Sequence, residues 1–502
     1  MIAALEFTTT LGALLIAFFG LSQAWLALNY RHSKAIDGAA KAAPVWVGPM
    51  PRVLLQLPIY NERYVVDRLL RAAARVDYPR ELLTIQLLDD STDETTAIAA
   101  ATITDLAKQG IKIEHVRRAD RSGYKAGALQ AGLALNDSEF IAIFDADFII
   151  QPDFIKRIIG YFKDPKIGMV QTRWSHLNAN YSLLTKILAF GIDAHFSMEQ
   201  GGRQASESFI NFNGTAGMWR RKTIDNAGGW SSDCLTEDLD LSFRSQLKDW
   251  KLLFVEAITT PSELPVEMSA IRSQQFRWCK GALEAGRKNL PPLWRSNFPL
   301  KAKIVGTFHM MNVLIFPGVL LLSILAALYV LIFGHAAEKE FMWVSLLLGV
   351  GTVSAIFAYA TAQTHGQFKD RNSNPVNAAV AAFNFMLLTS GLGVHNSIAV
   401  IQGILGKATP FVRTPKLNIT DMKQDIVEKR AYSLGALSPI VFAEIAVALF
   451  FTGLTLYCLL AGMYYLVLVY GYFAAGYVMV CVFTVGELLN YIGHSGQKTT
   501  PK

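Results

Sequence analysis

Residues 140–147 read Phe-Ile-Ala-Ile-Phe-Asp-Ala-Asp: five apolar residues, followed by two aspartates that one alanine separates. The apolar run predicts a buried strand. In an extended segment, residues two apart point the same way, so Asp145 and Asp147 form a carboxylate pair at its end. Two like charges repel unless a cation joins them, and hard oxygen ligands suit Mg²⁺ or Mn²⁺ held together with substrate phosphates. This stretch therefore predicts a metal site for a diphosphate-sugar.

Short apolar strand candidates recur on both sides of this stretch, at residues 53–56, 84–88 and 168–171. They alternate with helical stretches at residues 63–75 and 95–108. That alternation predicts a mostly parallel sheet flanked by helices, within a soluble domain of residues 45–300.

The composition places the rest of the chain in a different environment. Of 502 residues, 52% are hydrophobic and only 17% are charged, against about 25% charged in an ordinary soluble domain. The net charge is +7, but the sequence has no long run of basic residues. We therefore expect the excess positive charge to anchor the protein beside a membrane, and we expect no nucleic-acid partner. None of the four cysteines forms a CxxC pair, which favours reduced, structural thiols.

Apolar segments long enough to cross a membrane flank the predicted soluble domain. The first, at residues 8–28, is followed by Arg31, His32 and Lys34, which by the positive-inside rule places the next segment in the cytoplasm. The others lie at residues 304–333, 342–362, 376–405, 436–459 and 464–483. Glycines at 391 and 393 interrupt the third of these, so it is either a short hairpin or a span followed by an interface helix.

Polar clusters follow two other strand candidates, at the sheet edge where open α/β sheets bind ligands. Pro58, Tyr60 and Glu62 follow the first strand, although a simple turn would look similar. Asp89 and Asp90 follow the second, and paired carboxylates there suit hydrogen bonding to a nucleobase or ribose. The adjoining residues 91–93 have a second reading as a helix cap.

A third acidic cluster, Thr236-Glu237-Asp238, precedes a helical stretch at residues 239–247. Asp238 could cap that helix. Its functional reading is a general base that takes a proton from an acceptor hydroxyl as it attacks the anomeric carbon. A base of this kind complements a metal that neutralises the leaving group.

Two tryptophans each follow an arginine in a polar segment. In residues 274–278, Arg277 can pair bidentately with a diphosphate and Trp278 offers a flat face to a sugar ring. Residues 171–174 supply Gln171, Arg173 and Trp174. A tryptophan in a soluble domain is more often core than ligand platform, and that alternative stays open for both.

These motifs together resemble the processive inverting β-glycosyltransferases of the cellulose synthase and hyaluronan synthase type. They occur in family order and span nearly the whole chain: residues 58–62, Asp89-Asp90, residues 123–127, Asp145-Ala146-Asp147, residues 171–174, Thr236-Glu237-Asp238 and residues 274–278. The resemblance implies a Rossmann-like α/β glycosyltransferase domain of GT-A type, inserted between membrane helices and followed by a C-terminal transmembrane bundle. It divides the chain into an N-terminal helix (1–30), the catalytic domain (45–300), membrane and interface helices (301–405), a gating loop (406–433), a transmembrane hairpin (434–486) and a tail (487–502).

The family implies a role for each of these residues. Asp238 is the expected catalytic base, and Asp145 and Asp147 are the expected ligands of Mg²⁺ or Mn²⁺. The expected nucleotide-sugar contacts are Pro58, Tyr60, Glu62, Asp89, Asp90, Lys125, Asp145 and Arg277. The expected acceptor contacts are Gln171, Arg173, Trp174, Glu237 and Trp278. The expected gating-loop residues, in a loop that departs from its cellulose synthase form, are Phe411, Arg413, Thr414 and Lys416.

Residues 211–217 and 121–125 are similar to the plant-type mannan and glucan synthase-like enzymes. The sequence thus predicts a multi-pass membrane enzyme with a cytosolic catalytic domain, in a bacterial inner membrane or a Golgi or plasma membrane. It would polymerise a β-glucan or glucomannan with inversion and translocate it, with UDP-glucose as the first donor and GDP-mannose close behind. The alternatives are transfer of a single sugar to a lipid, and a transporter without nucleotide turnover.

Overall fold

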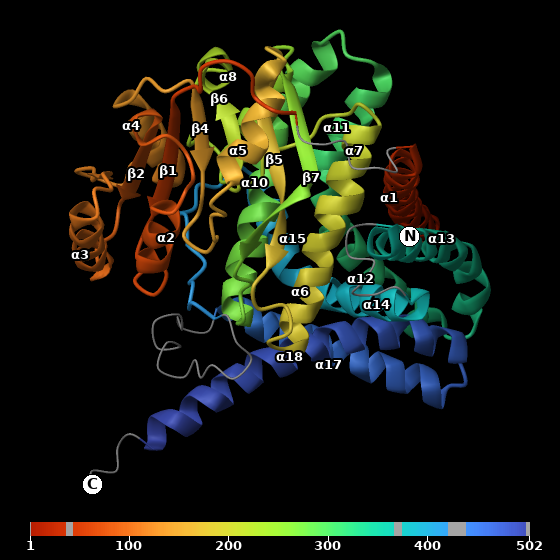
Figure 1. The fold of residues 1–502 in the computed structure, drawn as a ribbon. Helices are drawn as coiled ribbons and strands as arrows, with labels where there is room; N and C mark the ends of the chain where they lie inside the picture. Colours follow the sequence, from red (N-terminus) through yellow and green to blue (C-terminus); the bar gives the residue numbers. More distant parts are fainter. Residues whose placement is uncertain (1, 37–43, 366–373, 420–437, 498–502) are drawn as a thin grey trace.

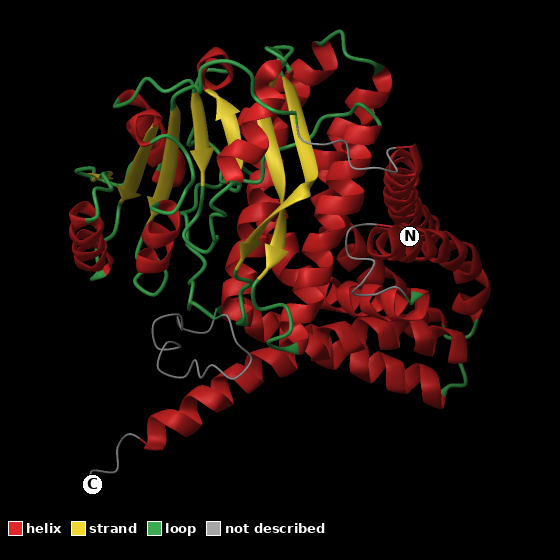
Figure 2. Ribbon diagram, in the orientation of Figure 1, coloured by secondary structure: helices red, strands yellow, loops and turns green. Residues whose placement is uncertain are grey.

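The computed structural model describes residues 2–36, 44–365, 374–419 and 438–497. It shows an α/β domain joined to a set of long apolar helices (Figures 1 and 2). A seven-stranded sheet has the order β3-β2-β1-β4-β6-β5-β7. The strands are β1 Val53–Ile59, β2 Leu83–Asp89, β3 Ile113–Val116, β4 Phe140–Ile143, β5 Ile167–His176, β6 Gly217–Arg220 and β7 Lys251–Ser262.

The sheet is mostly parallel, as predicted, with one antiparallel strand among those described. Strands β1 to β4 are parallel to one another, and β5 is parallel to β7. The short strand β6 runs antiparallel to both of its neighbours, β4 and β5, and joins the two parallel groups. The predicted α/β fold, a sheet flanked by helices, is confirmed.

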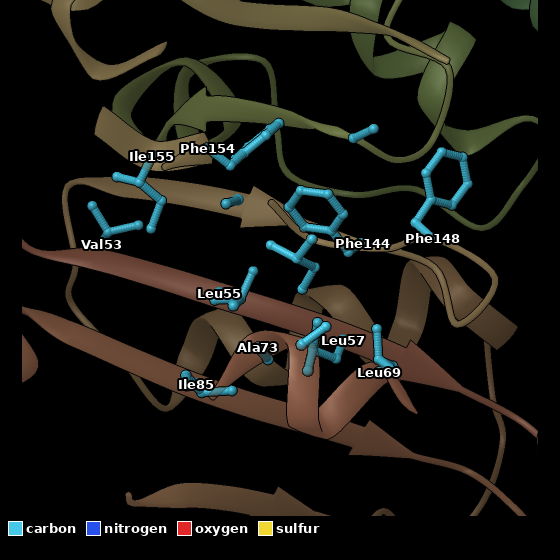
Figure 3. Close-up of a cluster of buried hydrophobic side chains, with 14 of the residues drawn as sticks. Val53, Leu55, Leu57, Leu69, Ala73, Ile85, Phe144, Phe148, Phe154 and Ile155 are labelled. Atoms are coloured by element: carbon cyan, nitrogen blue, oxygen red, sulfur yellow. The ribbon is translucent and has the colours of Figure 1, made fainter. Parts of the chain in front are cut away.

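Both faces of the sheet are buried at β1 and β4, which explains why these two strands are mainly apolar. Val53, Leu55 and Leu57 of β1 point into one core, together with residues of α2, α3 and α5 (Figure 3). Leu54 of the same strand points into the opposite core, where α4 packs. Successive residues of β1 alternate between these two apolar cores. They do not alternate between apolar and polar, as they would in a strand with one face exposed to solvent.

The helices of the α/β domain differ little from the predicted stretches. The predicted helix at 95–108 is α3, whereas the one at 63–75 shortens to α2. The helical elements of this domain are α2 Val66–Ala73, η1 Arg80–Leu82, α3 Thr95–Lys108, α4 Tyr124–Ala134, α5 Phe154–Ile159, η2 Gly160–Lys163, α6 Leu183–Ala194, η3 His195–Gly201, α7 Gly202–Ala205, α8 Arg221–Asn226, α9 Glu237–Gln246 and α10 Met268–Arg295.

The remaining helices are long and apolar. They are α1 Ile2–Ile36, α11 Leu300–Met311, η4 Asn312–Leu314, α12 Ile315–Phe333, α13 Ala336–His365, α14 Pro375–Gly391, α15 Gly393–Ile404, α17 Pro439–Leu460 and α18 Tyr464–Gln497. Within the described ranges, five helices could cross a membrane by length and composition: 7–33, 300–333, 346–365, 439–460 and 464–489. The interrupted run at 376–405 forms α14 and α15, which meet at a bend of 59°.

A buried ion pair joins the α/β domain to helices α17 and α18. Arg272 of α10 donates to Glu444 of α17 at 2.6 Å and to the Thr484 hydroxyl of α18 at 2.9 Å. The Glu487 carboxylate of α18 accepts from the backbone N–H of Met268, at the start of α10, at 2.6 Å. The two carboxylates of the hairpin therefore hold α10, and this structural role accounts for both charges without an ion pathway.

We expect Glu444→Ala to lower the free energy of unfolding by about 3–5 kcal/mol, because it leaves the Arg272 guanidinium buried without a counter-charge. The matched control is Asp137→Ala, which removes the exposed partner of Arg52 and should cost less than about 0.5 kcal/mol. Thermal unfolding in lipid nanodiscs measures both variants. Equal stability losses in the two would contradict the structural weight given to the buried pair.

Candidate active site

A cavity of about 210 Å³ lies at the carboxyl ends of β1 and β4, where the strand order of the sheet reverses. It brings together residues more than 350 positions apart in the sequence. The residues that line it include Pro58, Tyr60, Glu62, Asp90, Arg121, Lys125, Asp145, Asp147, Trp174, Asn213, Gly214, Glu237, Asp238, Gln274, Arg277, Trp278, Phe411, Arg413, Thr414 and Lys416.

The carboxylate pair lies at the centre of this cavity. The Lys125 Nζ donates to Asp145 Oδ1 at 2.5 Å, and the Lys416 Nζ donates to Asp147 Oδ2 at 2.5 Å. Burial, and then the charge of Asp147, raise the pKa of Asp145, opposed by Lys125. Two carboxylates beside two lysine ammonium groups fit a divalent metal that would share its coordination with substrate phosphates. The donor set thus suits Mg²⁺ or Mn²⁺ at Asp145 and Asp147.

Asp238 lies in the first turn of α9, and its Oδ1 accepts from the backbone N–H of Leu239 at 2.8 Å. Desolvation by burial, followed by the neighbouring charge of Glu237, raises the pKa of Asp238 to about 7. A carboxylate with a pKa near neutrality is suited to general base catalysis. Its bond to Leu239 stays within its own helix and leaves the second oxygen, Oδ2, toward Gly214.

The two adjacent aspartates after β2 separate in the structure. Asp90 lines the cavity and forms an ion pair with Arg118. Asp89 is fully buried and bonded to His115 Nε2 at 2.9 Å and to the Ser91 N–H at 2.8 Å. Burial opposes its ionisation, but these bonds lower the pKa of Asp89 to about 2. Asp89 is not among the described residues that line the cavity, and it orients the loop that carries Asp90.

The predicted acceptor residues of β5 also separate. Trp174 lines the cavity and packs against Phe148 and Phe196, with ring centroids 5.2 and 5.1 Å apart. Gln171 lies below the lining, where its Oε1 accepts from the backbone N–H of Asn213 at 2.8 Å. Arg173 is buried away from the cavity, in the electrostatic field of Glu256. A register shift between Thr172 and Arg173 changes the alternation of the strand.

Helix α10 holds the predicted gating loop against the cavity. Arg277 donates to the Val412 carbonyl and to the Thr414 hydroxyl, and its guanidinium lies 4.9 Å from the Phe411 ring centroid. Trp278, one residue further, lines the cavity with 39% of its surface exposed. One turn of α10 therefore both holds the loop and presents an open indole face.

The loop also reaches across to the first strand. Arg413 lies 3.7 Å from a carboxylate oxygen of Glu62, which follows β1. Burial raises the pKa of Glu62 to about 8, opposed by Arg413 and Lys416. The described part of the loop, up to Ile419, therefore contacts Asp147 through Lys416 and Glu62, after the carboxyl end of β1, through Arg413. The predicted loop residues 420–433 lie outside the described residues.

Sequence reasoning did not single out several residues of the cavity. Arg121 lies over the Tyr60 ring, 3.4 Å from its centroid. Gly214 has φ +82°, and a Cβ there would lie 3.1 Å from Asp238 Oδ2 and 3.4 Å from the Lys125 Nζ. The positive φ and the close approach of these two side chains favour glycine at that turn. The Asn-Gly pair at 213–214, a turn signal, could have pointed to it.

Comparison with known proteins places this geometry in a family. Residues 51–281 match the family described as "Glycosyltransferase like family 2". Over 260 residues the chain is 41% identical to probable glucomannan 4-beta-mannosyltransferase 4 of Oryza sativa subsp. japonica, covering 51% of this chain and 46% of that protein. It is 38% identical over 251 residues to glucomannan 4-beta-mannosyltransferase 7 of Arabidopsis thaliana, covering 49% and 45%. The matches thus span less than half the length of these relatives.

A solved structure shares the fold. The mannosyltransferase PcManGT from Pyrobaculum calidifontis, in complex with GDP-Man and Mn²⁺, superposes with a TM-score of 0.52 at 16% identity, over 80% of this chain and all of that one. At this identity the likeness establishes the fold alone. The domain formed by residues 51–281 is therefore a family-2 glycosyltransferase domain of the cellulose synthase-like type, built on a GT-A fold.

Proposed function

We propose that this protein is a membrane-bound, metal-dependent glycosyltransferase that extends a β-linked polysaccharide from a nucleotide-sugar, with inversion. The observation that carries the proposal is the single cavity in which the carboxylates of Asp145 and Asp147, the raised-pKa carboxyl of Asp238 and the open face of Trp278 meet. These are the parts that transfer to a sugar hydroxyl needs.

The chemistry follows from the arrangement. The sugar ring of the acceptor stacks on Trp278. Its hydroxyl attacks the anomeric carbon of the donor while Asp238 takes the hydroxyl proton. The new carbon–oxygen bond forms as the bond from the anomeric carbon to the diphosphate breaks, and the nucleoside diphosphate leaves with that electron pair. A divalent metal would supply charge neutralisation to the diphosphate. Lys125, Lys416 and Arg277 surround the same space and supply positive charge of their own.

The donor we propose first is GDP-mannose, because the relatives at 38–41% identity are named as glucomannan 4-beta-mannosyltransferases. UDP-glucose, which the sequence alone favoured, is the second. The product on this proposal is a mannan or glucomannan, and the growing chain is itself the acceptor. Helix α10, which carries Trp278, packs against α15 and α18, and this adjacency supports passage of the product between the membrane helices.

The contacts of the gating loop support one arrangement in the membrane. Lys416 meets Asp147, so the loop and the catalytic domain share a side. Two helices, 300–333 and 346–365, cross between them and return the chain to that side. The bent pair α14–α15 then makes no net crossing and is re-entrant or interfacial. With Arg31 and Lys34 at the C-terminal end of α1, the positive-inside rule makes the shared side the cytoplasm.

The test uses the purified protein in lipid nanodiscs with Mg²⁺ or Mn²⁺ and labelled GDP-mannose, UDP-glucose, UDP-N-acetylglucosamine and UDP-galactose, each offered separately. We expect a high-molecular-weight product from GDP-mannose, and we expect a β-mannan hydrolase to degrade that product. A lipid that carries one sugar would support a glycolipid synthase instead. No turnover of any donor would overturn the proposal and favour a transporter.

We expect the initial rate of transfer to rise about tenfold between pH 6 and pH 8, because a base with a pKa near 7 is mostly protonated at the lower value. The sign follows from the chemistry: only the deprotonated Asp238 can accept the hydroxyl proton. Initial rates at saturating donor and acceptor measure this. A rate that is highest at pH 6 would contradict the assignment of Asp238 as the base.

A further inference from the structure

A π-helical turn, η3, interrupts the helix that begins at α6 and ends at α7, so that residues 183–205 follow one path. Such wide turns are rare and are frequently found at functional sites. This one carries His195 and Glu199, with side chains 32% and 16% exposed, while the Phe196 between them is buried against Trp174 of the cavity. The turn therefore lies directly behind the acceptor side of the candidate active site.

A chain of hydrogen bonds leads from this turn to the cavity. Glu199 Oε2 lies 2.9 Å from His195 Nδ1, and His195 Nε2 lies 3.0 Å from Asn213 Nδ2. Arg203, one turn further, lies 3.6 Å from the same Glu199 oxygen. Asn213 lines the cavity beside Gly214, which abuts Asp238 and Lys125.

The surrounding bonds fix the direction of this chain. The Gln200 amide nitrogen donates to the Asn211 carbonyl at 2.6 Å and to Asn213 Oδ1 at 3.1 Å. The Asn211 side chain also donates to Asn213 Oδ1, at 2.7 Å. With its oxygen accepting twice, Asn213 must donate from Nδ2, so His195 accepts at Nε2 and donates from Nδ1 to Glu199.

An amide nitrogen has two hydrogens, and only one of those on Asn213 is directed at His195. The other is available to an oxygen atom within the cavity that Asn213 lines. A sugar ring on Trp278 presents hydroxyls on both sides of the one that attacks, and a hydroxyl oxygen accepts such a bond. The residue at 213 is therefore placed to recognise the acceptor, because its neighbour Gly214 abuts Asp238.

We propose that Glu199 and His195 are positioning residues that orient the Asn213 amide to donate a hydrogen bond to a hydroxyl of the acceptor sugar. The proposal rests on the proposed function, and it adds a specificity-determining group to the acceptor side of that site. Neither His195 nor Glu199 touches the reacting atoms. Their effect reaches the acceptor through one side chain, so it falls on acceptor affinity and not on donor binding.

Two substitutions of one residue separate the two bonds of His195. His195→Gln places an amide group near the former Nε2 and can still accept from Asn213. His195→Asn is shorter and reaches only the position of Nδ1, so it retains a partner for Glu199 and loses Asn213. We expect His195→Asn to raise the KM for a β-1,4-linked manno-oligosaccharide about tenfold. His195→Gln should stay within about threefold of wild type, and both should keep the donor KM.

A double-mutant cycle tests whether His195 acts through Asn213. Asn213→Ala should raise the acceptor KM as His195→Asn does, and the double variant should be no worse than Asn213→Ala alone. Hydrolysis of the nucleotide-sugar by water, measured without acceptor, should stay near the wild-type rate in His195→Asn and His195→Gln. That last readout separates lost acceptor recognition from a damaged fold, and it remains informative if one variant expresses poorly.

The outcomes are distinct. An unchanged acceptor KM in His195→Asn or in Asn213→Ala, in an enzyme that elongates acceptors, would overturn this inference and leave the proposed function standing. So would additive effects in the double variant, or equal losses of transfer and donor hydrolysis. A wild-type protein that elongates no acceptor with any donor would overturn the proposed function, and this inference with it.

Discussion

Replacing Asp238 with asparagine is expected to slow sugar transfer by a factor of at least about 10²–10⁴, while nucleotide-sugar binding stays within a few-fold of wild type. The asparagine keeps the shape of the side chain and its oxygen can still accept from the Leu239 N–H. It cannot accept the hydroxyl proton. Turnover of labelled donor and the donor dissociation constant, measured on the same preparation, test the two halves of the expectation.

The geometry explains why the loss falls on the chemical step. Asp238 Oδ1 is tied to its own helix, whereas Oδ2 faces Gly214, at a turn where a Cβ would approach it to 3.1 Å. The matched control is Asp233→Asn, which changes an exposed aspartate of the segment leading into α9 that pairs with Lys288. That variant should transfer at close to the wild-type rate. Retained turnover in Asp238→Asn would remove Asp238 as the base.

The strands that the sequence predicted share one property: they are apolar on both faces. Residues 53–56, 84–88 and 168–171 lie in β1, β2 and β5, and the predicted strand at 140–144 is β4, which ends one residue earlier. Strands β3 and β6 have four residues each and include charged side chains, so no periodicity distinguishes them. The antiparallel direction of β6 depends on the path of the chain between residues 176 and 217. Local sequence carries no record of that path.

The cavity residues were predictable where they belong to short motifs and unpredictable where they depend on side-chain direction. Asp145, Asp147, Glu237, Asp238, Arg277 and Trp278 all line the cavity. Asp89 and Asp90 are adjacent, and the pleat at the end of β2 sends one to His115 and the other to the cavity. The sequence motif predicts both aspartates as site residues, and it does not show which of them faces the cavity.

Contacts between distant segments account for the rest. Asn213 became a candidate only when the bonds of Gln200, Asn211 and His195 fixed its amide, and these depend on a π turn that no pattern in the sequence indicates. The bend between α14 and α15 was foreseen as an interruption at Gly391 and Gly393. In the arrangement proposed above, which rests on the contact between Lys416 and Asp147, this bent pair makes no net crossing.

Removing divalent metal with EDTA, or replacing Asp145 or Asp147 with asparagine, is expected to weaken nucleotide-sugar binding by about 10- to 100-fold and to stop transfer. Equilibrium binding of a labelled donor with and without EDTA measures this, followed by titration with Mg²⁺ and Mn²⁺ separately. The matched control is Asp153→Asn, an exposed aspartate shortly after the same strand, 3.9 Å from Arg157. It should leave metal-dependent binding unchanged.

The expectation rests on charge balance in an enclosed site. Asp145 pairs with Lys125 and Asp147 with Lys416, so the four groups together are neutral. The diphosphate of a nucleotide-sugar brings two negative charges, and burying them without compensation is costly. A divalent cation that enters with the diphosphate leaves the total unchanged, and it frees each lysine to turn from a carboxylate to a phosphate oxygen. Donor binding that is equally strong in EDTA would contradict the metal assignment and leave Lys125 and Lys416 as the groups that neutralise the diphosphate.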